Sequence, residues 1–319
     1  MKLDLTNPIY SDPDKARAHL EEQLWPNGPV CPHCGSQDAT ALDGKAHRKG
    51  LYQCNSCREQ FSVTVGTVFE RSKIGLHKWV LATHLMAASK KGISAKQIQR
   101  MLGVTYKTSW FMMHRIREAM SPDDVKDVGP LGGKGKTIEA DETFVGGKAK
   151  NAHKGKPVPK KQPVVALVER GGKARAKHVA DVTAKSVREV LVTQASRKSD
   201  LNTDDSLVYY YLGKEFAKHV SVNHSASEYV SKDGKSHTQT VESFFAILKR
   251  GIMGSFHSVS EAHLQRYVDE FCFRWNHRQS LEIDDTERAA AILKGAKGKR
   301  LTYRRIGEAK NIEAESPPF

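Results

Sequence analysis

Glu242 and Lys249 stand seven residues apart in a segment whose composition favours a helix, Thr238 to Arg250. Seven residues of an α-helix turn through about 700° and rise about 10.5 Å, so the carboxylate and the ammonium group would lie on one face. A carboxylate there could bind a metal ion, and the lysine could contact a phosphate. The other face has apolar spacing and predicts contact with the core; it comprises Val241, Phe244, Phe245, Leu248 and Ile252.

Two acidic pairs lie upstream, at positions 141–142 and 204–205. Residues 137–145 alternate between apolar and polar side chains, which places Asp141 on a strand, and residues 200–204 form a short strand candidate that ends at Asp204. Taken singly, an acidic residue at such a position is more often a surface charge than a ligand. Carboxylates on two strands and on a helix edge together favour one shared site.

Reaction at a phosphodiester bond needs a nucleophilic oxygen and a leaving oxygen, both stabilised by divalent cations about 3.5–4 Å apart. Mg²⁺ prefers oxygen ligands, which carboxylates supply. We therefore predict that Asp141, Asp204 and Glu242 hold two Mg²⁺ or Mn²⁺ ions. Glu142 and Asp205 are the alternatives to the aspartates beside them. The lysine seven residues after the glutamate is expected to hold a phosphate or a base near the reacting bond.

Four of the five cysteines form two Cys-x-x-Cys pairs, Cys31 with Cys34 and Cys54 with Cys57, with 19 residues between the pairs. Each pair can bring two thiolates to one ion, and two pairs complete a tetrahedral four-sulfur site for one structural Zn²⁺. Such a closed shell leaves no open position for chemistry. A redox role is the alternative, but two pairs at this spacing favour a zinc ribbon. Cys272 is expected to be buried without a chemical role.

Residues 76–120 have a helical pattern. An amphipathic helix over 76–90 precedes a second that begins at the capping residue Ser94, and a third runs from about 105 to 120 after the turn at Gly103. A helix, a short glycine-containing turn and a basic helix predict a helix-turn-helix, whose second helix can enter the major groove of DNA. An ordinary helical bundle is the alternative. The third helix carries Tyr106, Lys107, Thr108, His114, Arg115 and Arg117.

A linker rich in glycine and proline, residues 121–136, precedes a second domain. Its succession of elements is the one expected for a ribonuclease H-like α/β domain. The lysine-rich stretch 148–163 is either a loop that grips phosphates or a disordered insertion, and the run Tyr209 to Tyr211 is expected to pack in the core. Strands are expected at 137–145, 163–168, 176–182, 200–204 and 218–223, and helices at 184–197, 207–216, around Glu242 and at 260–279.

The chain has 319 residues, of which 39% are hydrophobic, enough for two or three domains with cores. Its 51 Lys and Arg exceed its 36 Asp and Glu by 15, and its isoelectric point is near 9.5, which favours nucleic acid as a partner. A solvated basic surface is the alternative. Signal-peptide and membrane-span patterns are missing. We expect a cytoplasmic, nucleoid-associated protein with reduced thiols and no membrane partner.

Several motifs must be taken together: Cys31-Pro-His-Cys34-Gly, Cys54-x-x-Cys57, Glu139-Ala-Asp141-Glu-Thr-Phe-Val-Gly146-Gly147-Lys148, Thr203-Asp204, Val222-Asn-His224-Ser, His237-Thr-Gln-Thr-Val-Glu242, Leu248-Lys249-Arg250-Gly251 and Arg274-Trp-Asn276-His-Arg278. They span roughly residues 20–280. Together they resemble the zinc-ribbon-bearing DDE transposases of bacterial insertion sequences, in the ISXO-like branch. The combination is highly specific, although Thr203-Asp204 alone would carry little weight.

The resemblance implies a ribonuclease H-like core that cuts DNA at the ends of a mobile element and transfers the strand into target DNA. It implies terminal inverted repeats and target DNA as partners, and at least a dimer, because two ends must be joined. Relatives have an acidic or Asn third catalytic position followed by Lys. Where they resemble His-Thr-Asn-Thr, this chain has Gln239, and Glu242 is therefore our predicted third ligand.

Four other residues of these motifs are expected to have one of two roles. His224, Arg274, Asn276 and Arg278 either shape the site or make buried hydrogen bonds. A non-enzymatic DNA-binding regulator that uses only the first ~120 residues, and a nuclease without strand transfer, are the alternative functions. The expected domains are an N-terminal region with the zinc ribbon (1–70), a helix-turn-helix region (71–120), a linker (121–136), a ribonuclease H-like catalytic domain (137–285) and a basic C-terminal tail (286–319).

Overall fold

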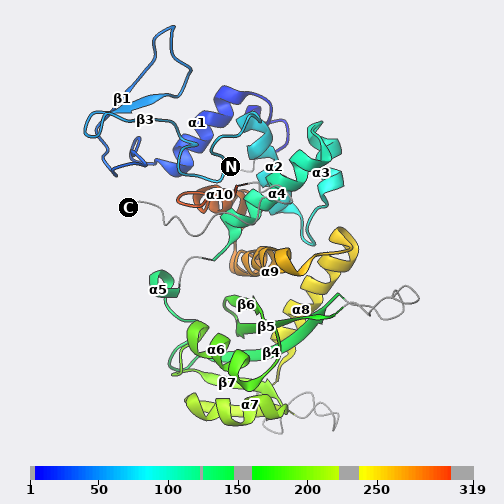
Figure 1. Cartoon of the computed structure of the whole chain (residues 1–319). Helices are drawn as coiled ribbons and strands as arrows, with labels where there is room; N and C mark the ends of the chain where they lie inside the picture. The colour runs from blue at the N-terminus through cyan, green and yellow to red at the C-terminus, as the bar shows by residue number, and fades with distance from the viewer. Residues whose placement is uncertain (1–3, 123–124, 147–159, 223–236, 303–319) are drawn as a thin grey trace, which may run out of the picture.

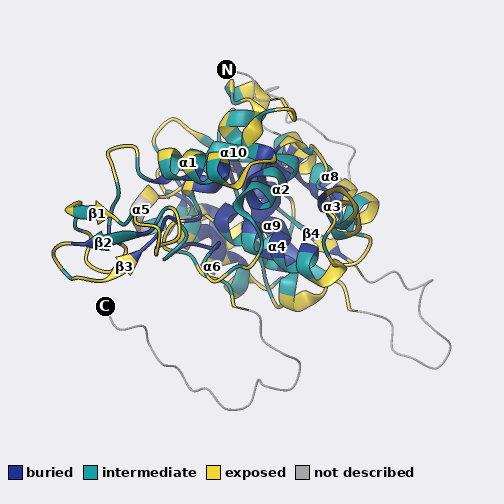
Figure 2. Ribbon diagram, turned by 90° about the horizontal axis from the view of Figure 1, so that it is seen from above, coloured by how far each residue is buried: buried dark blue, intermediate teal, exposed yellow. Residues whose placement is uncertain are grey.

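The computed structural model describes residues 4–122, 125–146, 160–222 and 237–302. A helical lobe with a small three-stranded sheet lies on one side of helix α9 (Glu261–Asn276), and a five-stranded sheet with its own helices lies on the other side (Figure 1). Seen from above, buried residues gather where α2, α4 and α9 stack, while the three-stranded sheet projects to one side (Figure 2). None of the described helices is long and apolar enough to span a lipid bilayer.

The helical lobe is built from short helices whose ends are set by local capping residues. Asp12 accepts hydrogen bonds from the backbone N–H groups of Asp14 and Lys15 and so starts the first helix, and Thr105 accepts one from Thr108 at the start of another. Both caps satisfy N–H groups that the first helical turn leaves unpaired. The helices are η1 (Pro8–Tyr10), α1 (Pro13–Leu24), α2 (Leu76–Ala88), α3 (Ala95–Leu102), α4 (Tyr106–Met120) and α10 (Asp285–Lys294).

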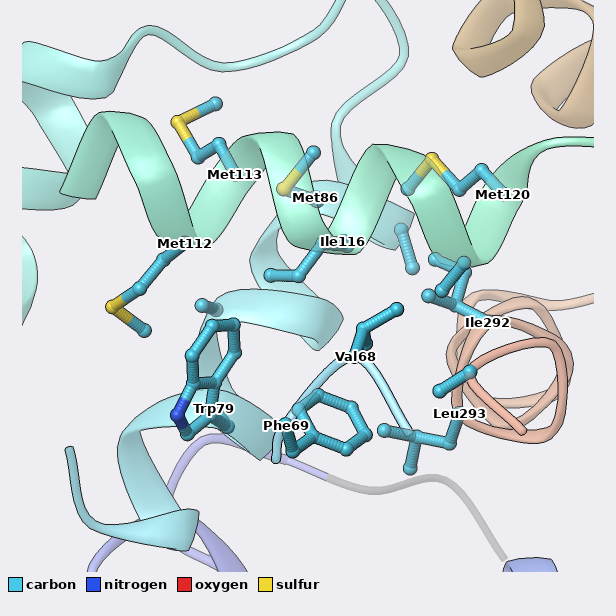
Figure 3. Close-up of a cluster of buried hydrophobic side chains, with 14 of the residues drawn as sticks. Val68, Phe69, Trp79, Met86, Met112, Met113, Ile116, Met120, Ile292 and Leu293 are labelled. Carbon is cyan, nitrogen blue, oxygen red and sulfur yellow. The ribbon is translucent and has the colours of Figure 1, made fainter. Parts of the chain in front are cut away.

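The core of this lobe joins α2, α4 and α10 (Figure 3). Met112 and Ile116 point from α4 towards Trp79 of α2, whereas Met113 extends from another side of the helix, and all four side chains are at most 2% exposed. Ile292 and Leu293 reach the same core from α10. Removing each such side chain from water contributes about 1.5–3 kcal/mol, so the last helix is an integral part of the lobe.

Helix α10 lies in the segment that we expected to be a basic tail. A capping box starts it, in which Asp284 accepts from the N–H of Glu287 and the Glu287 carboxylate accepts from the N–H of Asp284. Further contacts return the chain to the start of the lobe: the N–H of Val68 donates to the carbonyl of Ala296, and Thr67 forms a β-bridge with Lys297. In the sequence, the short apolar stripe of α10 is followed by several lysines, and this basic composition led us to expect a tail.

The small sheet has the order β1-β2-β3 and is antiparallel throughout; its strands are β1 (Ala39–Ala41), β2 (Tyr52–Cys54) and β3 (Gln60–Phe61). Trp25 packs edge-on against the rings of Tyr52 and Phe61, and the Phe61 ring is fully buried. This aromatic cluster is the core of the small sheet beneath the cysteines.

The large sheet has the order β6-β5-β4-β7-β8. β4, β5 and β6 form an antiparallel meander, whereas β7 and β8 run parallel to β4. Its strands are β4 (Thr137–Val145), β5 (Gln162–Glu169), β6 (Ala174–His178), β7 (Asp200–Asp204) and β8 (Lys218–Val222). The helices of this lobe are α5 (Val125–Val128), α6 (Ala184–Gln194), α7 (Leu207–Leu212), η3 (Gly213–Glu215), α8 (Gln239–Gly251), the π-helix η5 (Ile252–Phe256), α9 and η6 (Gln279–Leu281).

Helices cover both faces of the large sheet. Along β5, Val164, Ala166 and Val168 pack with α8 and α9, whereas Val165 and Leu167 pack with α6 and α7. This alternation follows the period of two of a strand and explains the continuous apolar run, because both faces of the strand are buried. The order of strands and helices along the chain is also the one expected for this domain.

A buried ionic contact joins the two lobes. Arg117 of α4 donates to Glu270 of α9 at 2.7 Å, Arg274 donates to the same carboxylate at 2.6 Å, and Glu270 is fully buried. The Arg117 guanidinium also lies 4.0 Å from the centre of the Tyr267 ring. A charge withdrawn from water requires such close partners, so α4 and α9 are fixed to one another.

The tyrosine run of α7 differs from expectation. Only Tyr209 is in the core, fully buried, whereas Tyr210 and Tyr211 are 58% and 73% exposed. A six-residue helix on the sheet surface turns just one of three consecutive side chains inward, since neighbours along a helix point about 100° apart. The prediction of core packing was therefore wrong for two of the three.

Candidate functional site

Two adjacent parallel strands carry aspartates at corresponding positions. Glu139 of β4 pairs with Asn202 of β7, and two residues farther along each strand come Asp141 and Asp204. Residues two apart on a strand share a face, so both aspartates project on the side of the sheet that α8 covers. The carbonyl of Asp204 accepts from Thr203, and one of its carboxylate oxygens accepts from the N–H of Ser206 at 3.2 Å.

Glu242 lies in the first turn of α8, over that same face of the sheet. The Thr238 hydroxyl donates to its carboxylate at 3.3 Å. Lys249 follows two turns later and is exposed. The apolar face predicted for this helix is confirmed, since all five of its residues are at most 6% exposed; they are Val241, Phe244, Phe245, Leu248 and Ile252.

The carboxylates are close enough to influence one another. Burial and, to a smaller extent, the negative charges of Glu142, Asp204 and Glu242 together raise the pKa of Asp141 to about 7, against the lowering effect of the N–H of Glu142 that donates to Asp141 at 2.7 Å. Neighbouring carboxylates in a partly buried position repel one another, and bound cations relieve this repulsion. The donor set, made of carboxylate oxygens, fits hard divalent ions such as Mg²⁺ or Mn²⁺.

The carboxylates are spread more widely than the ligands of a single ion. In the described part of the chain, the four cysteines are the only group of three or more candidate side chains whose ligand atoms all lie within 4.8 Å of one another. Two ions about 3.5–4 Å apart span a broader set of oxygens than one ion does. Among the described residues, the carboxylates at the sheet therefore do not form a closed shell of the kind that the cysteines form.

Glu142 and Asp205, the alternative ligands, have different surroundings. Glu142 projects to the other face of the sheet, where its carboxylate accepts the hydroxyl of Tyr209 at 2.7 Å, and burial raises its pKa. Asp205 is exposed just beyond the end of β7. It borders a surface cleft of about 430 Å³ that also contacts Asp204, Lys214 and Lys218. The geometry favours Asp141 and Asp204 over these neighbours.

Glu139 is a residue to which sequence reasoning gave no role. It is fully buried two residues before Asp141 on the same face, and it contacts Arg170 and the first turn of α8. The signal was present as an acidic residue at the i−2 position of a strand, because such a residue must share the buried face with Asp141.

The four cysteines converge as predicted. The Sγ atoms of Cys31 and Cys57 lie 3.7 Å apart, and those of Cys34 and Cys54 lie 3.6 Å apart. A tetrahedron with Zn–S bonds of about 2.3 Å has edges of about 3.8 Å, so these two sulfur pairs lie close to the spacing that Zn²⁺ requires, and all four sulfurs lie within 4.8 Å of one another. These residues fit a structural zinc ion.

Both cysteine pairs use the same tight turn. The N–H of Gly35 donates to the carbonyl of Cys31, and the N–H of Arg58 donates to that of Cys54. Gly35 and Arg58 both adopt a left-handed backbone, with φ of 77° and 65°. The N–H groups of Cys57 and Ser56 lower the pKa of the Cys54 thiol to about 6, which favours the thiolate that binds zinc.

Helices α3 and α4 are the two helices of the predicted helix-turn-helix. Ser94 caps α3, Gly103 ends it in the left-handed conformation with φ of 61°, and Thr105 caps α4. A cleft of about 300 Å³ lies beside the first turns of α4, and its basic residues are Arg71, Lys73, Lys107 and Arg115. Positive charge at a helix N-terminus that also presents backbone N–H groups suits a phosphate.

The basic residues near the end of α9 are occupied by hydrogen bonds within the fold. Arg274 binds Glu270 and the carbonyl of Ser89, and Asn276 makes two bonds to the backbone of Ala174. Arg278 donates to the carbonyls of Gly172 and Trp275. Of the two roles considered, buried hydrogen bonding agrees with these contacts. His224 and most of the lysine-rich stretch, residues 147–159, lie outside the described residues.

Comparisons with known proteins match two parts of this chain to family models. Residues 130–276 match the model of the ISXO2-like transposase domain, and residues 11–60 match that of the transposase zinc-ribbon domain. An uncharacterized protein in transposable element ISH50 of Halobacterium salinarum is 27% identical over 280 residues, which cover 82% of this chain and 90% of that relative. No solved structure gives a significant match.

Proposed function

Because the chain belongs to the transposases that join an ISXO2-like domain to a zinc ribbon, we propose that it cuts DNA at the ends of an insertion sequence and transfers the strand into target DNA. The observation that carries the proposal is the set of three carboxylates on one face of the large sheet. Asp141 and Asp204 occupy corresponding positions on parallel strands, and Glu242 lies above them on α8.

The order and directions of the strands support a ribonuclease H-like core. Three antiparallel strands precede a helix, and two further strands run parallel to the first, with closing helices packed on the sheet. This is the succession expected for that fold. Asp204 ends β7, and Asp141 lies just beyond the last residue of β4 that pairs with β7, so both aspartates lie at the carboxyl end of the parallel pairing, where open α/β sheets bind their ligands.

Each group in the site has a separate task in this proposal. Two divalent ions, when bound, stabilise the attacking and leaving oxygens of the phosphodiester. Asp141, Asp204 and Glu242 hold and orient those ions, and Lys249 binds a phosphate oxygen on the same helix edge. The Tyr209 hydroxyl is buried and donates to Glu142, so it is not placed to attack DNA. Cleavage and joining then need no covalent protein intermediate.

The helical lobe would hold the DNA ends. Its basic cleft beside α4 suits backbone phosphates, and the α3–α4 pair has the layout of a helix that enters the major groove. The zinc ribbon adds a second, rigid contact surface. Two ends must be cut together, so the active form is proposed to be a homo-oligomer, at least a dimer on DNA, acting in the cytoplasm at the nucleoid.

Cleavage of a labelled element end in Mg²⁺ tests the proposal. Asp204→Asn should lower both cleavage and joining by at least about 10²–10³-fold, because one ion loses a charged ligand, while zinc content and DNA binding stay unchanged. Asp205→Asn is the matched control and should retain activity. Binding without cleavage by the wild-type protein would instead indicate a regulator, and cleavage without a joined product would indicate a nuclease. Wild-type activity in Asp204→Asn would reject the ligand assignment.

A further inference from the structure

We propose that Glu139 is a positioning residue that holds α8, and with it Glu242, at a fixed height above Asp141, and thereby sets the affinity of the carboxylate site for divalent cations. The inference rests on the proposed function, since it assigns a role towards the same ions. It concerns a residue that contacts neither the ions nor the DNA in that proposal.

The start of α8 has no cap of its own. Its N-cap residue, Thr238, makes no side-chain hydrogen bond to the first-turn N–H groups, although a helix leaves four of these unpaired. Glu139 supplies the cap from the neighbouring strand. Its carboxylate accepts from the N–H of Thr240 at 2.7 Å, from the N–H of Val241 at 3.1 Å and from the Thr240 hydroxyl at 2.8 Å. A negative charge is also favoured at the positive end of the helix dipole.

A second set of contacts fastens this cap to the sheet. Arg170, which follows β5, donates to Glu139 at 2.7 Å and to the carbonyl of His237 at 2.9 Å. The Asn202 side chain of β7 donates to the same carbonyl at 3.4 Å. Glu139 is fully buried, so its charge depends on these partners. Glu139 of β4 and Asn202 of β7 are thus joined through Arg170 and the carbonyl of His237 to the chain that enters α8.

Glu139 is close in the chain to one proposed ligand, and the residues that it caps are close to another. Glu139 is two residues from Asp141 on the same face of β4, and the N–H groups that it binds belong to the two residues immediately before Glu242. Loss of the cap frees the first helical turn to rise or rotate. Because ligand oxygens must lie within tenths of an ångström of an ion, a small movement of Glu242 weakens ion binding.

Glu270 provides a matched control. It is likewise fully buried, and it is bound to two arginines where Glu139 is bound to one, but its ion pairs lie within α9 and between α9 and α4, and not at the first turn of α8. Its replacement should cost folding stability without moving Glu242. Comparison of the two variants therefore separates positioning from general support of the fold.

The test uses the full-length, zinc-loaded protein without DNA, titrated with Mn²⁺ and followed by the electron paramagnetic resonance signal of free Mn²⁺. Glu139→Gln should weaken Mn²⁺ binding about 10–100-fold, the range measured when residues that orient metal ligands are removed. Glu270→Gln should lower the melting temperature and keep wild-type Mn²⁺ affinity. Thr240→Val, which removes one contact to Glu139, should weaken binding by a smaller factor and decides the matter if Glu139→Gln does not fold.

Cleavage gives an independent readout. Saturating Mn²⁺ should restore the activity of Glu139→Gln, because its ligands remain, but not that of Asp141→Asn. Wild-type Mn²⁺ affinity in Glu139→Gln, or in Thr240→Val where the first variant does not fold, would overturn the inference and leave the proposed function intact. Equal Mn²⁺ binding by Asp141→Asn and the wild-type protein would instead reject the proposed site itself.

Discussion

The zinc ribbon and the large sheet both gather potential metal ligands, and they do so in opposite ways. In the ribbon, two short turns place four sulfurs within 4.8 Å of one another. In the sheet, the candidate ligands come from β4, β7 and α8, and burial together with the neighbouring negative charges raises the pKa of Asp141 to about 7. The first site is set by local backbone geometry, whereas the second depends on strand register and on the docking of a helix.

This difference has an energetic reason. A structural zinc site contributes to folding and can be closed completely, so it is favourable for all ligands to be fully in place. A site for reaction must leave room for substrate oxygens around its ions. Its carboxylates therefore stay apart, and the surrounding fold must oppose their repulsion. Arg170 and the first turn of α8 surround Glu139 just beneath them.

The largest effect is expected when the ribbon loses its zinc. Cys54→Ser should reduce the zinc content from one ion per chain to none and unfold residues 31–61, because zinc binding supplies about 10 kcal/mol to small domains of this kind. Elemental analysis and hydrogen exchange measure the two outcomes. Cys272→Ala, a buried cysteine in α9, should keep the zinc. Mn²⁺ binding at the large sheet should be equal in both variants, and its loss in Cys54→Ser would mean that the two sites are coupled.

A medium effect is expected at Asp141, where stability and pH are linked. Its pKa is about 7 in the folded state and near 3.8 in the unfolded state, so the folded protein retains a proton that the unfolded chain has lost. Wild-type stability without Mg²⁺ or Mn²⁺ should fall as pH rises from about 4 to 7 and change little above that. Asp141→Asn should lack this loss and be more stable at pH 8 by roughly 1–3 kcal/mol.

Urea denaturation at pH 5 and pH 8 measures this difference. Adding Mn²⁺ at pH 8 should stabilise the wild-type protein, since an ion that binds only the folded state shifts the equilibrium towards it, and should not stabilise Asp141→Asn. Equal pH profiles for the two proteins would show that neither burial nor the neighbouring charges raise the pKa of Asp141.

The smallest effect is expected in the turns of the ribbon. Arg58 adopts φ of 65°, a conformation that costs a side-chain-bearing residue about 1 kcal/mol relative to glycine. Arg58→Gly should therefore tighten zinc binding by up to about 1 kcal/mol in a chelator competition, and Gly35→Ala should weaken it by a similar amount. Nothing lies within 4 Å of a Cβ at position 35, so the second change tests the backbone alone.

Sequence reasoning succeeded where the pattern is local. The cysteine spacing specified the sulfur cluster, and the period of Val241, Phe244 and Leu248 specified the buried face of α8. The alternation of residues 137–145 gave the bounds of β4 without error. In each case a tight turn, a helical period or a strand period acts within one element, so neighbouring residues contain the information.

It failed where distant contacts decide. Glu139 owes its burial to α8, which begins 100 residues later, so its place two residues before Asp141 indicates the face of the strand that it shares but not the helix that covers it. Helix α1 was not anticipated, and α10 lies where we expected a tail, because the apolar residues of both helices are buried only by packing with helices distant in the chain, chiefly α2. The pairing of Glu139 with Asn202, which aligns the two aspartates, is likewise a property of the sheet and not of either strand.

The return of the chain through α10 has a mechanical consequence. Since residues 285–297 rejoin the lobe that starts the polypeptide, the large sheet is tethered to that lobe at both of its ends, by the segment after α4 and by the segment after α9. Two chain connections restrict the motion of the large sheet relative to the helical lobe more than a single connection would. The distance between the α3–α4 region, proposed to bind DNA, and the acidic face of the large sheet, proposed to cut it, is therefore limited by these two chain connections.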